Sequence, residues 1–151
     1  MGDWNSVEDV LDYAILREQE AADFYTGLAA NAEHQHMKSI FEGFAREEES
    51  HKKRLQSIKN KGLFGKPRKA VKDLKIGDYL VADQSTDTTN YQDALILAMQ
   101  KEKAAYRLYS DLANLAEDES MRNVFQRLAQ DEAKHKLRFE VEYDDNILTE
   151  N

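Results

Sequence analysis

Two copies of one short pattern, a glutamate followed three residues later by a histidine, carry side chains of the types that can bind metal ions. They are Glu48 with His51 in the stretch FAREEESH, and Glu132 with His135 in the stretch LAQDEAKH. Residues three apart on a helix project from the same face. A carboxylate and an imidazole on one face suit iron or manganese, and they also accommodate zinc. One such pair is common on solvated helices, so its repetition is what makes it informative.

The repetition extends well beyond these two pairs. Residues 14–55 align without a gap on residues 98–139, so the chain contains an internal repeat. Its length suggests a single domain, residues 1–151. The matched pairs whose side chains could do chemistry are Glu18 with Glu102, Tyr25 with Tyr109, Glu48 with Glu132, and His51 with His135.

Apolar residues at alternating spacings of three and four predict two helices in each half of the repeat. The first helix of each half opens on a capping signal, Ser6-x-x-Asp9 in one and Asn90-x-x-Asp93 in the other. Short polar turns, EHQH and EDES, make the paired helices antiparallel. The apolar stripes run over residues 11–32 and 41–55, and again over residues 95–116 and 125–139.

A long connection, about residues 61–88, separates the two halves. Gly62, Gly65 and Pro67 end the preceding helix, and the stretch DLKIGDYLV could form a short helix or a strand. The sequence therefore predicts an all-α fold, an antiparallel four-helix bundle with one long crossover between helices 2 and 3.

Six positions of the predicted apolar seams hold ionisable residues instead. Burying one unpaired carboxylate is costly, and burying four close together adds repulsion. Two divalent cations would balance the four negative charges, and two neutral imidazoles would complete the ligand set. The competing interpretation, buried ion pairs, requires lysine or arginine at facing seam positions, and the seams hold none. The predicted metal ligands are Glu18, Glu48, His51, Glu102, Glu132 and His135.

Composition excludes several other classes of function. The chain has no cysteine, which removes disulfides, thiol catalysis and iron–sulfur clusters. Its net charge of −8 argues against nucleic-acid and anionic-membrane partners. No signal peptide and no membrane-spanning stretch is visible, so we expect a soluble, cytoplasmic protein.

The helical motifs resemble a known family. EQEAADFYTGLA with FAREEESH, and EKAAYRLYSDLA with LAQDEAKH, are similar to the rubrerythrin branch of the ferritin-like superfamily. The resemblance implies a ferritin-like fold with a di-iron centre, in which Glu48 and Glu132 bridge the metals. The family places a tyrosine seven residues after the first-helix ligand, which selects Glu18 and Glu102 and not Glu20.

The chain departs from rubrerythrins in two respects. It lacks the four cysteines of a rubredoxin domain, so electrons would come from a separate donor. Rubrerythrins also carry an additional glutamate three residues after the third-helix ligand, where this chain has Ala105; the matching residue of the first half is Ala21. The six-residue ligand set therefore looks more like that of bacterioferritin.

The leading hypothesis is a di-iron oxidoreductase that reduces hydrogen peroxide, or O₂, with electrons from an external donor such as rubredoxin. Two iron ions are the expected cofactor, with manganese or zinc as possible substitutes, and a homodimer is expected. Tyr25 and Tyr109 could hydrogen-bond a ligand, donate protons or be oxidised, or they could be ordinary core residues. The alternatives are a ferroxidase or iron-handling protein, and a non-catalytic metal-binding interaction module.

Three further segments have simpler interpretations. His34 and His36 are expected to be solvated. The basic run KGLFGKPRKAVK is expected to be a solvated loop, with docking of an acidic electron donor at Lys66, Arg68 and Lys69 as the alternative. The final stretch, EVEYDDNILTEN, is short and acidic and is expected to form a tail.

Overall fold

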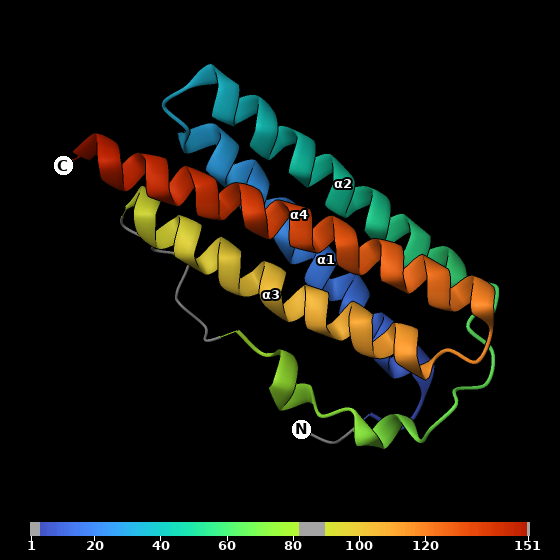
Figure 1. The fold of residues 1–151 in the computed structure, drawn as a ribbon. Helices are drawn as coiled ribbons and strands as arrows, with labels where there is room; N and C mark the ends of the chain where they lie inside the picture. The colour runs from blue at the N-terminus through green and yellow to red at the C-terminus, as the bar shows by residue number, and fades with distance from the viewer. Residues whose placement is uncertain (1–3, 82–89, 151) are drawn as a thin grey trace. The chain divides into compact units, whose positions relative to one another are not determined.

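The computed structural model describes residues 4–81 and 90–150, and these residues form four long α-helices and two short 3-10 helices (Figure 1). No strand occurs in this part of the chain. The predicted all-α fold class, with four long helices and a long connection between the second and the third, is confirmed. The helices are α1 (Val7–Asn31), α2 (Gln35–Asn60), η1 (Val71–Asp73), η2 (Ile76–Tyr79), α3 (Tyr91–Leu115) and α4 (Glu119–Glu150).

The chain divides into two compact units, Met1–Asp73 and Leu74–Asn151, each built on one helical hairpin. Among the described helices, none is both long enough and apolar enough to cross a membrane. The first unit holds α1, α2 and η1, and the second holds η2, α3 and α4. The unit boundary falls between the two short helices of the predicted crossover.

The first helix of each unit begins at the residue that the sequence predicts. The side chain of Ser6 accepts a hydrogen bond from the backbone N–H of Asp9 at 3.2 Å, and Asn90 accepts one from Asp93 at 2.7 Å. Each cap satisfies a backbone donor that has no partner within its helix. These two caps fix the start, and therefore the register, of the helices that carry Glu18 and Glu102.

In the first unit, α1 and α2 run antiparallel, side by side (Figure 1). Their interior is apolar except near the middle, with Leu11, Phe41 and Leu55 almost fully buried. Helix α2 ends at Asn60, and Gly62 just beyond it has a φ of 61°, which lies in the left-handed region. The N–H of Leu63 then donates to the carbonyl of Ile58 at 3.0 Å, which closes the last turn.

In the second unit, α3 and α4 also form an antiparallel hairpin (Figure 1). The short helix η2 packs on α3, where the buried Tyr79 donates a 2.6 Å hydrogen bond to the carboxylate of Asp111. The connection thus contains short helices rather than a strand, at least as far as Val81. The rest of the predicted crossover, residues 82–88, lies outside the described residues.

The acidic stretch after Phe139 is not a tail, contrary to the sequence-based expectation. It continues α4 as far as Glu150. Tyr91 donates a hydrogen bond to Glu142 at 2.8 Å, and Gln92 donates one to Asn146 at 3.1 Å. The start of α3 therefore holds the last turns of α4 in place, despite their weak apolar pattern.

Candidate metal centre

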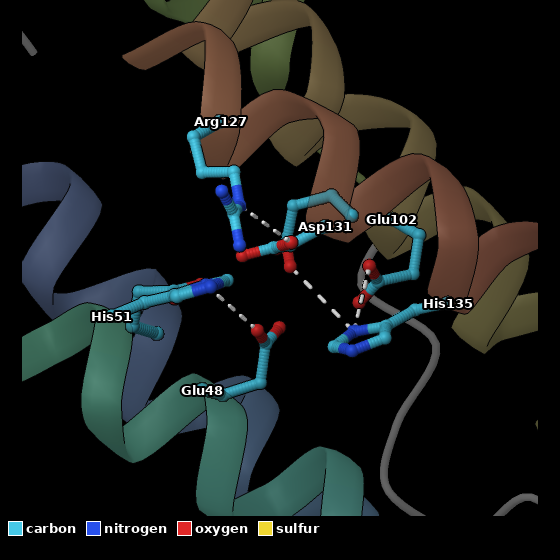
Figure 2. Close-up of polar contacts among 8 residues, drawn as sticks. Glu48, His51, Glu102, Arg127, Asp131 and His135 are labelled. Atoms are coloured by element: carbon cyan, nitrogen blue, oxygen red, sulfur yellow. Dashed lines mark ion pairs between the residues drawn. The ribbon is translucent and has the colours of Figure 1, made fainter. Parts of the chain in front are cut away.

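The first hairpin brings together three ionisable residues in its buried interior. Glu18 comes from α1, and Glu48 and His51 come from one face of α2. Their exposed fractions are 1%, 0% and 6%. The Nδ1 atom of His51 lies 2.9 Å from a carboxylate oxygen of Glu18 and 3.1 Å from one of Glu48. We call this group the first triad; Figure 2 shows the contact between His51 and Glu48.

The second hairpin repeats the arrangement with the residues that the 84-residue shift predicts (from Glu18 to Glu102). Glu102 comes from α3, and Glu132 and His135 come from α4; their exposed fractions are 1%, 0% and 2%. Nδ1 of His135 lies 3.5 Å from Glu102 and 3.6 Å from Glu132, which is looser than the first triad. Figure 2 shows His135 and Glu102 pointing toward one another. We call this group the second triad.

The electrostatics of the first triad favour a positive charge at its centre. Burial by itself lowers the pKa of the His51 imidazole. Hydrogen bonds to Glu18 and Glu48, together with their negative charges, outweigh burial and raise that pKa to about 11. Without metal, this raised pKa favours the protonated imidazole at neutral pH, with Nδ1 facing both carboxylates. A metal ion would take the place of that proton.

The donor set of each triad fits a metal ion. Each triad offers two carboxylates and one imidazole, whose ligand atoms lie within 4.8 Å of one another. Carboxylate oxygens with an imidazole suit iron, manganese or zinc. A buried pair of carboxylates also needs positive charge nearby, because two like charges in a dry interior repel strongly. The buried Glu and His groups are therefore suited to metal binding, while the assignment of all six residues as ligands stays a prediction.

Tyr25 and Tyr109 occupy the predicted interior positions of α1 and α3, with exposed fractions of 0% and 1%. Their surroundings differ. The ring of Tyr25 meets Phe44 edge-on at a centroid distance of 6.3 Å, whereas Tyr109 is tilted against Phe125 at 6.2 Å. Both tyrosines are part of the packed interior, and their chemical roles stay predictions.

The other acids and histidines near the motifs are not part of the triads. Glu47 is exposed, and Glu49 is half-buried. Glu20 pairs with Arg17 at 3.0 Å on the outside of α1. His34 and His36 are both exposed, as expected for solvated residues.

One partly buried hydrogen bond, between Tyr79 and Asp111, could not be predicted from the repeat. The position equivalent to Asp111 in the first half is Gly27, and Tyr79 lies in the crossover, which has no second copy. The only signal in the sequence is the apolar character of the stretch around Tyr79. A second contact missed in the same way joins the two helices of the first hairpin, where Lys52 donates a hydrogen bond to the side chain of Gln19.

Comparisons with known proteins agree with this geometry. The rubrerythrin family model matches residues 9–143, a range that includes both triads. Among solved structures, the chain is similar to a hypothetical protein from Pyrococcus furiosus, with 25% sequence identity and a TM-score of 0.72. That alignment covers 92% of this chain and 89% of the other. A comparison with curated proteins gave no match.

Proposed function

Because the chain belongs to the rubrerythrin family, we propose that the two triads bind two iron ions and that the protein reduces hydrogen peroxide, or O₂, with them. The observation that carries the proposal is the recurrence of a buried Glu–Glu–His triad at matched positions of both hairpins. A chance charge cluster would have little reason to recur at the same three positions of a duplicated unit.

The charges of the triads support two divalent ions. Four carboxylates carry four negative charges, which two divalent cations balance if both imidazoles are neutral. Glu48 with His51, and Glu132 with His135, each lie on one helical face and approach a metal together. Glu18 and Glu102 come from the other helix of each hairpin, so metal binding would also tie the two helices of a hairpin together.

Bound ferrous iron supplies two electrons in total, which matches the reduction of one hydrogen peroxide and two protons to two water molecules. The buried carboxylates would hold the ions away from bulk water and limit their loss. A role for Tyr25 is supported by the direction of helical side chains, which lean toward the N-terminus of their own helix and here toward Glu18. The same argument applies to Tyr109 and Glu102. We assign these phenols to proton donation or to hydrogen bonding with the ligand carboxylates.

Electrons for repeated turnover would come from a separate donor. This chain contains no cysteine, so it holds no iron–sulfur group that could relay them. We propose an external one-electron donor such as rubredoxin, with a homodimer in the cytoplasm as the working state.

The test compares reduced, iron-loaded protein with the same concentration of free ferrous ions. The expected result is faster loss of peroxide with the protein, and an absorption change that reverses when reductant is added. Protein that reacts no faster than free ferrous ions would refute the proposed activity. Bound metal whose absorption does not change on peroxide addition would instead favour a non-catalytic, metal-stabilised module.

A ferroxidase or iron-handling role is a second candidate, and one observation favours it. Ala21 and Ala105 stand where an additional carboxylate would extend the ligand set. The predicted set of six ligands therefore lacks the additional glutamate of rubrerythrins and looks more like that of bacterioferritin. Storage predicts many iron ions per chain and a large closed assembly on gel filtration. Peroxide reduction predicts two iron ions per chain and a dimer.

A further inference from the structure

The segment from Lys61 to Lys72 has a charge opposite to that of the rest of the chain. It carries five basic residues and no acidic one, although the whole chain has a net charge of −8. The rest of the chain therefore has a net charge of −13 (−8 minus +5). We call residues 61–72 the basic segment; its exposed basic side chains are Lys61, Lys66, Arg68, Lys69 and Lys72.

The basic segment is attached to the first unit at both of its ends. At one end, the turn at Gly62 closes α2, and Phe64 is 3% exposed. At the other end, Val71 in η1 is 6% exposed. These buried apolar side chains hold the backbone while the charged side chains point to solvent. Pro67 further restricts the conformations between the two attachment points.

A hollow of about 510 Å³ lies between the basic segment and the start of α1. Its lining includes Asn5, Ser6, Val7 and the acidic Glu8 on one side, and Gly65, Pro67 and Lys72 on the other. The surface beside the basic residues is therefore concave, and it offers both apolar and hydrogen-bonding groups.

We infer that the basic segment is the docking surface for the acidic protein that supplies electrons to the metal centre. This inference rests on the proposed function, which needs two electrons from outside the chain. The segment directly follows α2, the helix that carries His51. Asn60, the last residue of α2, lies about 14 Å along the helix axis from His51, at about 1.5 Å per residue. A donor bound here would stand next to the end of a helix that supplies two ligands.

The charge distribution favours a compact acidic protein over an extended polyanion. Charges at physiological salt are screened beyond about 8 Å. A protein with one acidic face can contact the basic segment alone. Nucleic acid or an anionic membrane extends further and would also meet the rest of the chain, whose net charge is −13 (−8 minus +5).

The electron transfer from donor to peroxide balances. Two encounters with a one-electron donor deliver two electrons, and these reduce one hydrogen peroxide and two protons to two water molecules.

The experiment uses full-length, iron-loaded protein and reduced rubredoxin, a small acidic iron–sulfur protein, as the probe. Charge reversal at Lys66, Arg68 and Lys69 should lower the second-order rate constant for oxidation of rubredoxin by about tenfold or more at low salt. It should also make that rate less dependent on salt. The control variant reverses three exposed basic residues elsewhere, Lys38, Lys53 and Lys134, and should change the rate much less.

Two readouts separate the docking inference from the proposed function. Peroxide reduction driven by dithionite needs no docking, so it should be equal in the wild type and both variants. If even the wild type fails in that assay, the proposed function is wrong, and titration of rubredoxin binding still decides the docking inference. The inference would be overturned if rubredoxin bound equally well to the wild type and to the variant reversed in the basic segment. It would also be overturned if the control variant lost as much rubredoxin binding as the segment variant. Binding to anionic vesicles or DNA that depends on the segment, without rubredoxin binding, would also overturn it.

Discussion

The imidazole Nδ1 of His51 lies 2.9 Å from a carboxylate oxygen of Glu18, on the opposite helix of the same hairpin. Both groups are buried, and the sequence separates them by 33 residues (from 18 to 51). The contact places an ionisable nitrogen between two carboxylates. A proton or a metal ion can satisfy the same charge there, so pH and metal should compete for the first triad.

Metal binding should release a proton from His51. The pKa of its imidazole is raised to about 11 without metal, whereas a ligating imidazole must be neutral. The affinity of the first triad for a metal ion should therefore fall as the pH is lowered through the neutral range, by about tenfold per pH unit for each proton displaced. Titration calorimetry in buffers with different protonation enthalpies measures this release. The control variant, His34→Gln at an exposed position, should release the same number of protons as the wild type. Metal binding without proton release would contradict the account.

The metal-free protein should lose stability as the pH rises. The pKa of His51 in the folded state, about 11, is above the ordinary value of 6.5 expected for the unfolded chain. The folded state therefore holds this proton more tightly, and the stabilisation is complete only below about pH 6.5. It declines continuously as the pH rises toward 11. Urea unfolding of chelator-treated protein, compared with His51→Asn at several pH values, isolates this effect. The prediction would be contradicted if the difference in free energy of unfolding between the wild type and His51→Asn grew as the pH rose.

Replacing either buried tyrosine with phenylalanine should separate chemistry from metal binding. Tyr25→Phe keeps the ring, with its contact to Phe44, and removes only the hydroxyl. The rate of peroxide reduction should drop by about tenfold or more if the phenol donates a proton, and two metals per chain should still bind. Tyr109→Phe tests the same role in the second triad. Unchanged rates in both variants would show that the tyrosines are core residues only.

Much of the candidate site was predictable because the chain contains it twice. Glu48 and Glu49 are adjacent acids of one helix, and composition or local pattern cannot rank them. The repeat separates them, because Glu48 matches Glu132 while Glu49 matches Ala133. The structure agrees on burial, with Glu48 fully buried and Glu49 half-buried. The capped starts of α1 and α3 were predictable for a local reason, since a cap needs only the residues beside it.

The parts without a second copy were much harder to predict. Short 3-10 helices have no long apolar period, so η1 and η2 leave little trace in the sequence. The last turns of α4 carry many acids, and hydrogen bonds from residues near the start of α3 hold them helical. Such contacts join residues about fifty positions apart, which local patterns cannot reveal.

Tyr79→Phe should weaken the attachment of η2 to α3. The hydroxyl of Tyr79 donates a 2.6 Å hydrogen bond to Asp111, and both burial and this bond raise the pKa of the phenol. Loss of a hydrogen bond to a half-buried carboxylate should lower the free energy of unfolding by about 1–2 kcal/mol. Urea unfolding measures the loss. The matched control is Tyr106→Phe, at 45% exposure on the same helix as Asp111. Equal stability of the two variants would show that the bond contributes nothing.

The metal content of two neighbouring variants tests the central claim most directly. Glu48→Gln keeps the size of the buried side chain and removes its charge, and Glu49→Gln makes the same change on the half-buried neighbour. Elemental analysis should find two metal ions per chain in the wild type and in Glu49→Gln, and a clear loss in Glu48→Gln. Circular dichroism should show that all three proteins are helical. Equal metal content in the two variants, both folded, would contradict the assignment of the buried triads as the metal centre.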